Sequence, residues 1–414
     1  MTSILGRQPV SNTSYKIHAY DVLFRSDDDL DHPTNTTISA SSLTRIMNDF
    51  GLENVIGSYH GFIRVDTDFL SKDIVFTIPK ESFTLMILQS SFLDTNLPKE
   101  LEKINKEGYQ LGLNDTAVTA ENFDSIIALL PYITSVKIDV LHSDPKFSQK
   151  LITILKAEKK TVIASKVETH ELYDQYVALE VDYFQGFYIK RPYILKSSSF
   201  SSSQDQIFQV WNLLHADAAT RDIVDALERN HALTLHLMQF INSSFFSFKN
   251  KISSVTQIVN LLGRNALGNW LLLLMVTTKN KDTRINHPLL LMVINRTEIM
   301  TSLLKLVRPN ADRKSQETAY LVGMLSLIHL LFEIEHREFL HKLHISDEIE
   351  EAMFEAHGFW GQLLTLTRYI ENADTQSIQV YIEKYDINID DMNTVITEAM
   401  IKVNAFDEMM QDMF

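Results

Sequence analysis

Hydrophobic residues follow two different patterns along the chain, and the change falls near residue 200. Before it, short runs rich in β-branched residues alternate with longer amphipathic stretches, a pattern that predicts strands joined by helices. The expected strands are Ser14–Phe24, Gly61–Val65, Ile74–Ile78, Gln110–Leu113, Ser135–Ile138, Thr161–Ser165 and Tyr183–Phe184. Their spacing of roughly 20–30 residues predicts a TIM-type β/α barrel, whose functional residues follow the C-terminal ends of the strands.

The second half of the chain has a helical pattern. From Gln204 onward, large apolar residues recur at three- and four-residue spacing, and no alternating strand pattern is visible. Between the halves, residues 196–203 contain six serines around one phenylalanine, which is typical of a linker. We therefore expect an α/β barrel over residues 1–195, a serine-rich joint over 196–203 and an all-α domain over 204–414.

Composition narrows the classes of function. The 414 residues include no cysteine, which excludes disulfides, cysteine-ligated metals and thiol nucleophiles. The formal net charge of −15 disfavours nucleic acid and anionic membranes, and so favours protein partners. The most apolar run, Trp270–Val276, is too short to span a membrane, and the first residues lack a secretory signal pattern. We expect a cytoplasmic protein.

Seven motifs follow one another through the first half. They are AYDVLFR (19–25), GFIRVDTDFL (61–70), VFTIPKES (75–82), GYQLGLNDTAV (108–118), VKID (136–139), ASKVET (164–169) and QGFYIKRP (185–192). In this order they resemble the EAL family, barrel enzymes that hydrolyse the bacterial messenger cyclic di-GMP with two divalent metals. The resemblance covers about 180 residues.

The resemblance implies that the catalytic positions of this family are altered here. Where the family has Glu, Asn, Glu, Asp and the catalytic Glu, this chain has Asp21, Arg64, Thr77, Asn114 and Ser165. Hard dications need several carboxylates. A dication facing a guanidinium at about 4 Å is repelled by about 8 kcal/mol at an effective dielectric near 20. We therefore predict no metal, no cofactor and no hydrolysis, which would make the chain a pseudoenzyme.

Other residues match the family and are candidates for residual nucleotide contacts. They are Arg25, Asp115, Lys137, Asp139, Glu168 and Gln185. Since the metals are expected to be absent, we predict that cyclic di-GMP binding is weak or absent. An alternative is an active or residual phosphodiesterase whose rearranged metal site uses Asp21, Asp115, Asp139 and Glu168. That alternative requires the four carboxylates to lie close together.

The second half carries a block over Leu233–Met275 whose distinctive residues are Asn242, Ser243, Ile252, Ser254, Leu262, Gly263 and Trp270. This block resembles the HDOD family of helical domains. The order of the two resemblances is that of EAL–HDOD signalling proteins of the YuxH type. It implies a regulator that binds signalling proteins, as a monomer or a homo-oligomer, in a cyclic di-GMP-linked pathway such as motility, biofilm formation or virulence.

The centre of that block reads as two short helices. Ser254 is a suitable helix cap, Gly263 is a suitable stop, and a second helix is expected from near Asn265. The same pattern resembles a DNA-binding helix-turn-helix over residues 252–276. The second helix is dominated by large apolar residues, with Arg264 as its one basic residue. We therefore expect it to be buried and predict no DNA binding.

Overall fold

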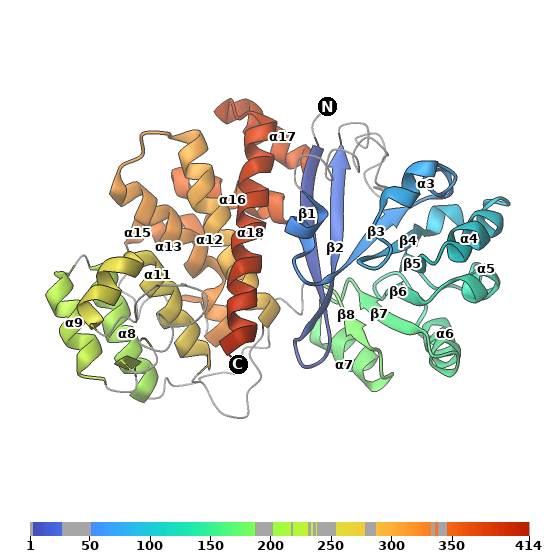
Figure 1. Cartoon of the computed structure of the whole chain (residues 1–414), viewed down its shortest axis with the longest axis horizontal. Coiled ribbons are helices and arrows are strands. Elements are labelled where there is room, and N and C mark those ends of the chain that lie inside the picture. Colours follow the sequence, from blue (N-terminus) through green and yellow to red (C-terminus); the bar gives the residue numbers. More distant parts are fainter. Residues whose placement is uncertain are drawn as a thin grey trace. The chain divides into compact units, whose positions relative to one another are not determined.

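The computed structural model describes residues 3–26, 51–186, 202–216, 218–230, 233–234, 237, 254–277, 287–332, 336–337 and 346–413 (Figure 1). Contacts divide the chain into two compact units. Unit 1 comprises Met1–Tyr193, Asn286–Ile328 and Ser346–Glu408, and unit 2 comprises Ile194–Ile285, His329–Ile345 and Met409–Phe414. Among the described residues, no helix has the length and apolar character needed to cross a membrane.

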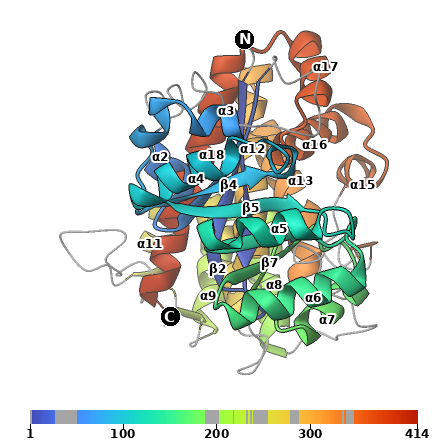
Figure 2. The ribbon, with the colours of Figure 1, turned by 90° about the vertical axis from the view of Figure 1, so that its right-hand side faces the viewer.

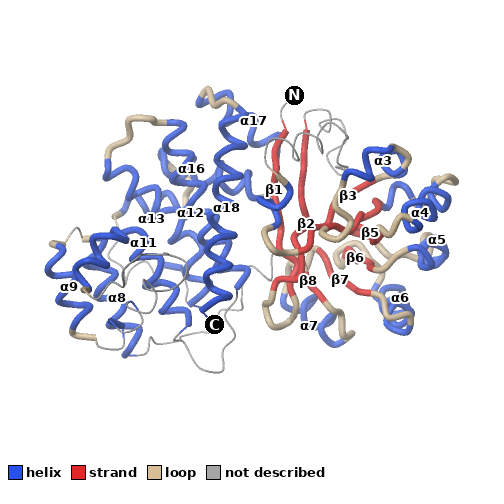
Figure 3. The backbone as a smooth tube through the Cα atoms, viewed as in Figure 1, coloured by secondary structure: helices blue, strands red, loops and turns tan. Residues whose placement is uncertain are grey.

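Unit 1 contains a closed barrel in which eight strands follow one another in chain order (Figure 3). The strands are β1 Ser3–Ser11, β2 Ile17–Ser26, β3 His60–Val65, β4 Phe83–Leu88, β5 Gln110–Thr116, β6 Ser135–Asp139, β7 Thr161–Ser165 and β8 Tyr183–Phe184. The strands β2 to β8 are parallel, whereas β1 is antiparallel to both of its neighbours. The predicted α/β barrel is confirmed, with an additional inverted strand at its start.

Short helices surround the parallel strands, and Figure 2 shows several of them lying along the outside of the barrel. They are α2 Leu52–Ile56, α3 Thr67–Leu70, α4 Leu97–Lys106, α5 Phe123–Leu129, α6 Pro145–Ala157 and α7 His170–Ala178, with 3₁₀ turns η3 Asp73–Thr77, η4 Gln89–Ser91 and η5 Leu130–Tyr132. In α6, Asp144 caps the first turn and Pro145 takes the first helical position. Helix α4 buries Leu97, Leu101 and Ile104, one face of an amphipathic helix.

Two expected strands differ from the structure, and the strands β1 and β4 were not expected. The predicted strand Ile74–Ile78 is wrong, because these residues form the 3₁₀ turn η3 and the adjacent end of a loop. The strand of this region is β4, whose six residues are all buried, so that no alternation marks it in the sequence. The sequence also gave no sign of β1, and it placed β2 three residues early because a turn at Asn12–Lys16 precedes it.

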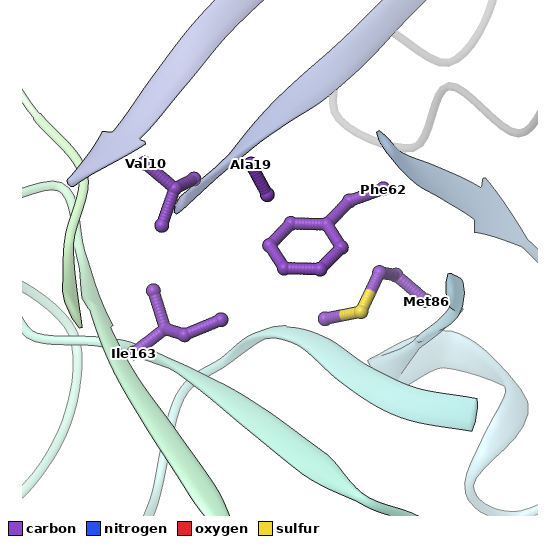
Figure 4. Close-up of a cluster of buried hydrophobic side chains, with 5 residues drawn as sticks. All are labelled: Val10, Ala19, Phe62, Met86 and Ile163. Carbon is purple, nitrogen blue, oxygen red and sulfur yellow. The ribbon is translucent and has the colours of Figure 1, made fainter. Parts of the chain in front are cut away.

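The interior of the barrel is filled in layers. One layer consists of the apolar side chains Val10, Ala19, Phe62, Met86 and Ile163, which converge from five strands (Figure 4). Successive side chains of a strand point to opposite faces, so the next inward residue lies two positions further along. Towards the mouth of the barrel these next positions are polar on β1, β2, β3 and β7, and apolar on β4, where Leu88 follows Met86. The apolar layer therefore forms the floor under the mouth of the barrel.

Every described element after residue 202 is a helix, which confirms the all-α prediction for the second half. Unit 1 includes α12 His287–Val307, α15 Asp347–Phe354, α16 Gly358–Glu371, α17 Thr375–Tyr385 and most of α13 Arg313–Phe332 and α18 Ile389–Met413. Unit 2 includes α8 Ser202–His215, α9 Thr220–Glu228 and α11 Val255–Thr277. Residues 196–201 of the serine-rich joint lie outside the described residues, and the domain boundary there stays a prediction.

The predicted helix break in the HDOD-like block is present. Gly263 has φ 71° and ψ 172°, which divides α11 into two helical segments. The guanidinium of Arg264 donates hydrogen bonds to the carbonyl oxygens of Leu214 and Ala218, at the end of α8. Leu267, Trp270 and Leu271 are buried, as expected for the second of these helices. Asn242, Ser243 and Ile252 lie outside the described residues.

Candidate functional site: a ring of charges at the mouth of the barrel

A polar layer lies directly above the apolar layer, at the mouth of the barrel. Gln8, Asp21, Arg64, Asn114, Lys137, Ser165 and Gln185 come from β1, β2, β3, β5, β6, β7 and the end of β8. Asp21 is two residues beyond Ala19, Arg64 two beyond Phe62, and Ser165 two beyond Ile163. The same strand geometry that buries the floor therefore gathers these side chains. Asp21, Arg64, Asp115 and Lys137 are called the charged ring below.

Asp21 is the central acceptor of the charged ring. Its Oδ2 accepts hydrogen bonds from Lys137 Nζ at 2.7 Å, from Arg64 Nη2 at 2.8 Å and from Gln185 Nε2 at 3.1 Å. The side chains of Asp21 and Lys137 are fully buried. Asp115 is the second carboxylate, with Oδ1 3.3 Å from Lys137 Nζ and Oδ2 3.6 Å from Arg64 Nη2. Two cations thus balance two carboxylates.

The pairing keeps the charged ring ionised in spite of its burial. Burial alone would raise the pKa of Asp21, but Arg64 and Lys137 together hold that pKa far below its ordinary value. For Asp115, Lys137 and Arg64 likewise outweigh burial and the neighbouring Asp21, and its pKa is lowered. Burial would lower the pKa of Arg64, yet the two carboxylates raise it. At neutral pH the two carboxylates and the guanidinium are charged.

A β-bulge turns Asp115 towards the charged ring. The pairing of β5 with β6 shifts register between Leu113 and Thr116, and Asp115 has a positive φ of 37°. Bulges of this kind are frequent beside functional sites, where they redirect a side chain. The preceding residue, Asn114, is buried and donates from Nδ2 to Asp115 Oδ2 at 3.3 Å. Consecutive residues of β5 therefore both contribute to the mouth.

Several buried polar atoms at the mouth have no hydrogen-bond partner among the described residues. They are Asp21 Oδ1, Arg64 Nε, Asn114 Oδ1 and Gln185 Oε1. Such groups cost about 1–3 kcal/mol each when nothing satisfies them, and they concentrate at sites that bind water or a ligand. The charged ring therefore has unused hydrogen-bonding capacity, in contrast to the floor below it.

Two residues predicted for the altered catalytic site differ in their surroundings. Thr77 lies in η3, is exposed, and donates its hydroxyl to Ile74 O, so the prediction that it stands at the catalytic site is wrong. Ser165 is buried and donates its hydroxyl to Ile138 O at 3.0 Å. Arg25 lies in β2, but its side chain is outside the described ones. On β4, the inward positions near the mouth are Met86 and Leu88, which are apolar.

The four carboxylates of the alternative metal site are only partly brought together. Asp21 and Asp115 share Lys137 and Arg64, as described above. Asp139 is buried, and its Oδ2 lies 2.6 Å from Lys166 Nζ and 2.8 Å from His142 Nδ1. Glu168 is exposed. The sequence reasoning did not foresee the roles of Lys166 and His142, although both stand close to strand ends.

We tested whether the charged ring fits the two dications that the EAL resemblance implies. Both of its carboxylates already face Arg64 and Lys137, and a dication would have to approach these two cations. Within the described part of the chain, no group of three or more His, Asp or Glu residues is arranged to hold a metal ion. The described arrangement does not fit a pair of dications.

Two family models match the chain in succession. The EAL domain matches residues 66–192, and the HDOD domain matches residues 201–362. Uncharacterized protein YuxH of Bacillus subtilis is 25% identical over 385 residues, covering 91% of this chain and 93% of the relative. Cyclic di-GMP phosphodiesterase CdgJ of Vibrio cholerae is 23% identical over 407 residues, which cover 96% of this chain and 91% of the relative. The solved EAL domain of FimX from Pseudomonas aeruginosa, bound to c-di-GMP, is 18% identical and covers 48% of this chain and 94% of its own, with a TM-score of 0.36.

These matches overturn one prediction. The conclusion that the chain is not an enzyme is wrong, because a relative aligned over 96% of the chain is named as a cyclic di-GMP phosphodiesterase and the EAL domain itself matches. The prediction rested on the loss of the metal ligands, which bears only on a metal-dependent reaction. At the mouth, Asp21 and Asp115 share the cations Arg64 and Lys137.

Proposed function

We propose that this chain, which carries an EAL domain followed by an HDOD domain, is a cyclic di-GMP phosphodiesterase of a bacterial signalling pathway. The phosphodiesterase CdgJ, similar over nearly the whole chain, supports the reaction. The observation that carries the proposal is the charged ring, which offers two cations and unsatisfied polar atoms at the mouth of the barrel. In parallel β/α barrels, this end of the strands is where substrates bind.

Arg64 is the residue of the charged ring best suited to meet the substrate. Its side chain is 18% exposed, and its Nε has no hydrogen-bond partner among the described residues. Each phosphodiester group of cyclic di-GMP carries one negative charge, and a guanidinium can bind two phosphate oxygens at once. Lys137 lies behind it, fully buried, as a fixed positive charge. Both cations would stabilise the negative charge that develops on the phosphate oxygens in the transition state.

In the proposed reaction, water attacks phosphorus and the bond from phosphorus to the 3′ oxygen breaks, which opens the ring of the substrate. The partly exposed Asp115 takes the proton of the water, and the leaving 3′ oxygen takes a proton from solvent. Because Arg64 and Lys137 lower the pKa of Asp115, it is a weak base, and we expect slow turnover. No step is derived through the metal pair, since the charged ring does not fit it.

The test is direct hydrolysis by the purified full-length chain. Cyclic di-GMP is incubated with Mg²⁺, with Mn²⁺ or with a chelator, and the linear dinucleotide is measured by chromatography. We expect product in all three conditions and at least a tenfold lower rate in Arg64→Ala and in Asp115→Asn. The control is Lys72→Ala, which removes a cation paired with Asp68 on the exposed surface of the barrel. Absence of product in every condition would contradict the proposal.

Three further proposals concern the HDOD domain and the chain as a whole. The proposals that it binds signalling or regulatory proteins, that the chain forms homo-oligomers and that it works in the cytoplasm stay predictions. A pull-down with the full-length chain, compared with a chain altered at Leu261 on α11, whose side chain is 56% exposed, tests the first of them. Loss of a specific partner in Leu261→Glu would support it.

A further inference from the structure

The hairpin of β1 and β2 has one face inside the barrel and one face outside. On the inner face, Gln8 and Asp21 are opposite each other in the pairing of the two strands. Gln185 Nε2 donates to both Gln8 Oε1 and Asp21 Oδ2. Because side chains alternate along a strand, the chain neighbours Arg7 and Tyr20 lie on the outer face. The inward residues Gln8 and Asp21 are thus each next in the chain to a residue of the outer face, Arg7 and Tyr20.

The outer face is attached to the C-terminal helix α18 by a cluster that we call the outer clamp, formed by Arg7, Tyr20 and Asn404. Arg7 Nη1 donates to Asn404 Oδ1 at 2.7 Å, and the guanidinium lies 4.3 Å from the centre of the Tyr20 ring. Arg7 also donates to the carbonyl oxygen of Val55, and Asn404 Nδ2 donates to the carbonyl oxygen of Asn54 at 2.9 Å. The outer clamp therefore joins α18 to the hairpin and to α2.

A cavity lies close to the outer clamp. A mainly apolar cavity of about 50 Å³ lies between the hairpin and the helices α12, α16 and α18. Leu5, Pro9, Leu291, Ile299 and Met400 contribute to its lining. A side chain beside such a cavity has fewer packing partners than one in a close-packed interior. The polar contacts of the outer clamp and buried apolar side chains such as Leu5, which is 1% exposed, together hold the hairpin against these helices.

Helix α18 also extends beyond the barrel unit. Its residues up to Glu408 group with unit 1, whereas Met409 and the residues after it group with unit 2. The helix is continuous from Ile389 to Met413. Asn404 lies about two and a half turns before Met413, so a displacement at the C-terminal end of the helix can be transmitted along it to Asn404.

We infer that α18 regulates the charged ring through the β1–β2 hairpin. When α18 is docked at the outer clamp, Arg7 and Tyr20 fix the hairpin, and the hairpin holds Asp21 and Gln8 at the mouth. When α18 moves, Asp21 loses its position relative to Lys137 and Arg64. The inference rests on the proposed function for its effect on hydrolysis, whereas its structural part can be tested without any substrate.

The structural test measures hydrogen exchange of the amides of residues 3–26 in the full-length chain. Asn404→Ala removes the acceptor of Arg7 on α18, and we expect exchange in the hairpin to become at least tenfold faster. The matched control, Lys402→Ala, lies on the same helix and breaks an ion pair with Glu298 of α12 at 2.6 Å. We expect the control to leave exchange in the hairpin unchanged.

A second variant keeps the inference testable if Asn404→Ala folds poorly. Asn404→Asp retains an oxygen that can accept from Arg7, loses the donor to Asn54 O and adds a negative charge that can pair with the Arg7 guanidinium. We expect hairpin exchange within threefold of wild type in Asn404→Asp. Equal exchange in Asn404→Ala, Lys402→Ala and wild type would overturn the inference, as would a variant Asn404→Asp that exchanges as fast as Asn404→Ala.

The functional test compares the rates of linear dinucleotide formation. We expect at least a threefold lower rate in Asn404→Ala and a wild-type rate in Lys402→Ala. If wild type forms no product, the proposed function fails, and hydrogen exchange alone decides the inference. If wild type is active and both variants hydrolyse at its rate, the proposed function stands and the regulation by α18 is refuted.

Discussion

The floor of the barrel and the charged ring above it are built by the same strands, two residues apart. The floor is apolar, and its members are at most 3% exposed. The charged ring is also largely buried, yet it holds four charges and several polar atoms without hydrogen bonds. A close-packed apolar layer stabilises a fold at little cost, whereas buried charges stabilise it only when every partner is present. The difference indicates that the floor maintains the barrel, and it agrees with the substrate-binding role proposed for the ring.

The largest expected effect comes from removing the central cation of the ring. Lys137→Met should lower the free energy of unfolding by about 3–5 kcal/mol, because Asp21 and Asp115 would lose their shared buried partner. Urea unfolding followed by circular dichroism measures the loss. The control Lys156→Met breaks the ion pair with Asp182, in which both side chains are 34% exposed, and should cost less than about 1 kcal/mol. Equal losses of unfolding free energy in the two variants would show that the ion pairs of the ring stabilise the fold no more than an exposed ion pair does.

Acid should act on the ring before it acts on the floor. The pKa values of Asp21 and Asp115 are lowered in the folded state, so their contribution to stability is present above the unfolded value near 4. It is lost as the pH falls below about 4 towards the folded values. Unfolding free energies measured between pH 5 and pH 2 should therefore decline more steeply in wild type than in the double variant Asp21→Asn, Asp115→Asn. Parallel curves would contradict the assigned pairing.

A smaller effect is expected from a conservative change in the floor. Ile163→Val removes one methylene from the apolar layer and should lower the free energy of unfolding by about 0.5–1.5 kcal/mol. Because Ile163 makes no polar contact with the ring, the rate of cyclic di-GMP hydrolysis should stay at the wild-type value. A strong loss of hydrolysis without a loss of stability would mean that the two layers do not have separate roles.

The smallest effect is expected at the opposite end of the barrel, below the floor. His60 Nε2 lies 2.9 Å from Thr84 Oγ1, and burial together with the nearby His18 lowers the pKa of His60. Since the folded pKa is depressed, the stability is present above the unfolded value of about 6.5 and is lost as the pH falls below it. Comparison of melting temperatures at pH 7.5 and pH 5.5 in wild type and His60→Gln measures this loss. A larger acid shift in the variant would contradict it.

The sequence predicted the mouth better than it predicted the strands around it. Asp21, Arg64, Asn114, Lys137 and Gln185 all lie in the polar layer, because each is in, or directly follows, a strand that periodicity or motif order could locate. Thr77 was misplaced, since the fully buried β4 has no alternating pattern and the neighbouring apolar run imitates a strand. Gln8 was missed together with β1, whose Gly6 and Pro9 are unusual within a strand.

The amino-acid pattern by itself determined the β/α barrel of the first half, the helical second half and the buried helix after Gly263. It also carried the motif order that resembles the EAL and HDOD families. Periodicity and short motifs are local properties of a chain, so the sequence alone shows them. Tertiary structure alone decided that Asp115 turns inward on a bulge, that Asp139 pairs with Lys166, and that Asn404 lies against Arg7 almost four hundred residues away. These contacts depend on barrel closure and helix packing, which bring together residues that no local pattern relates.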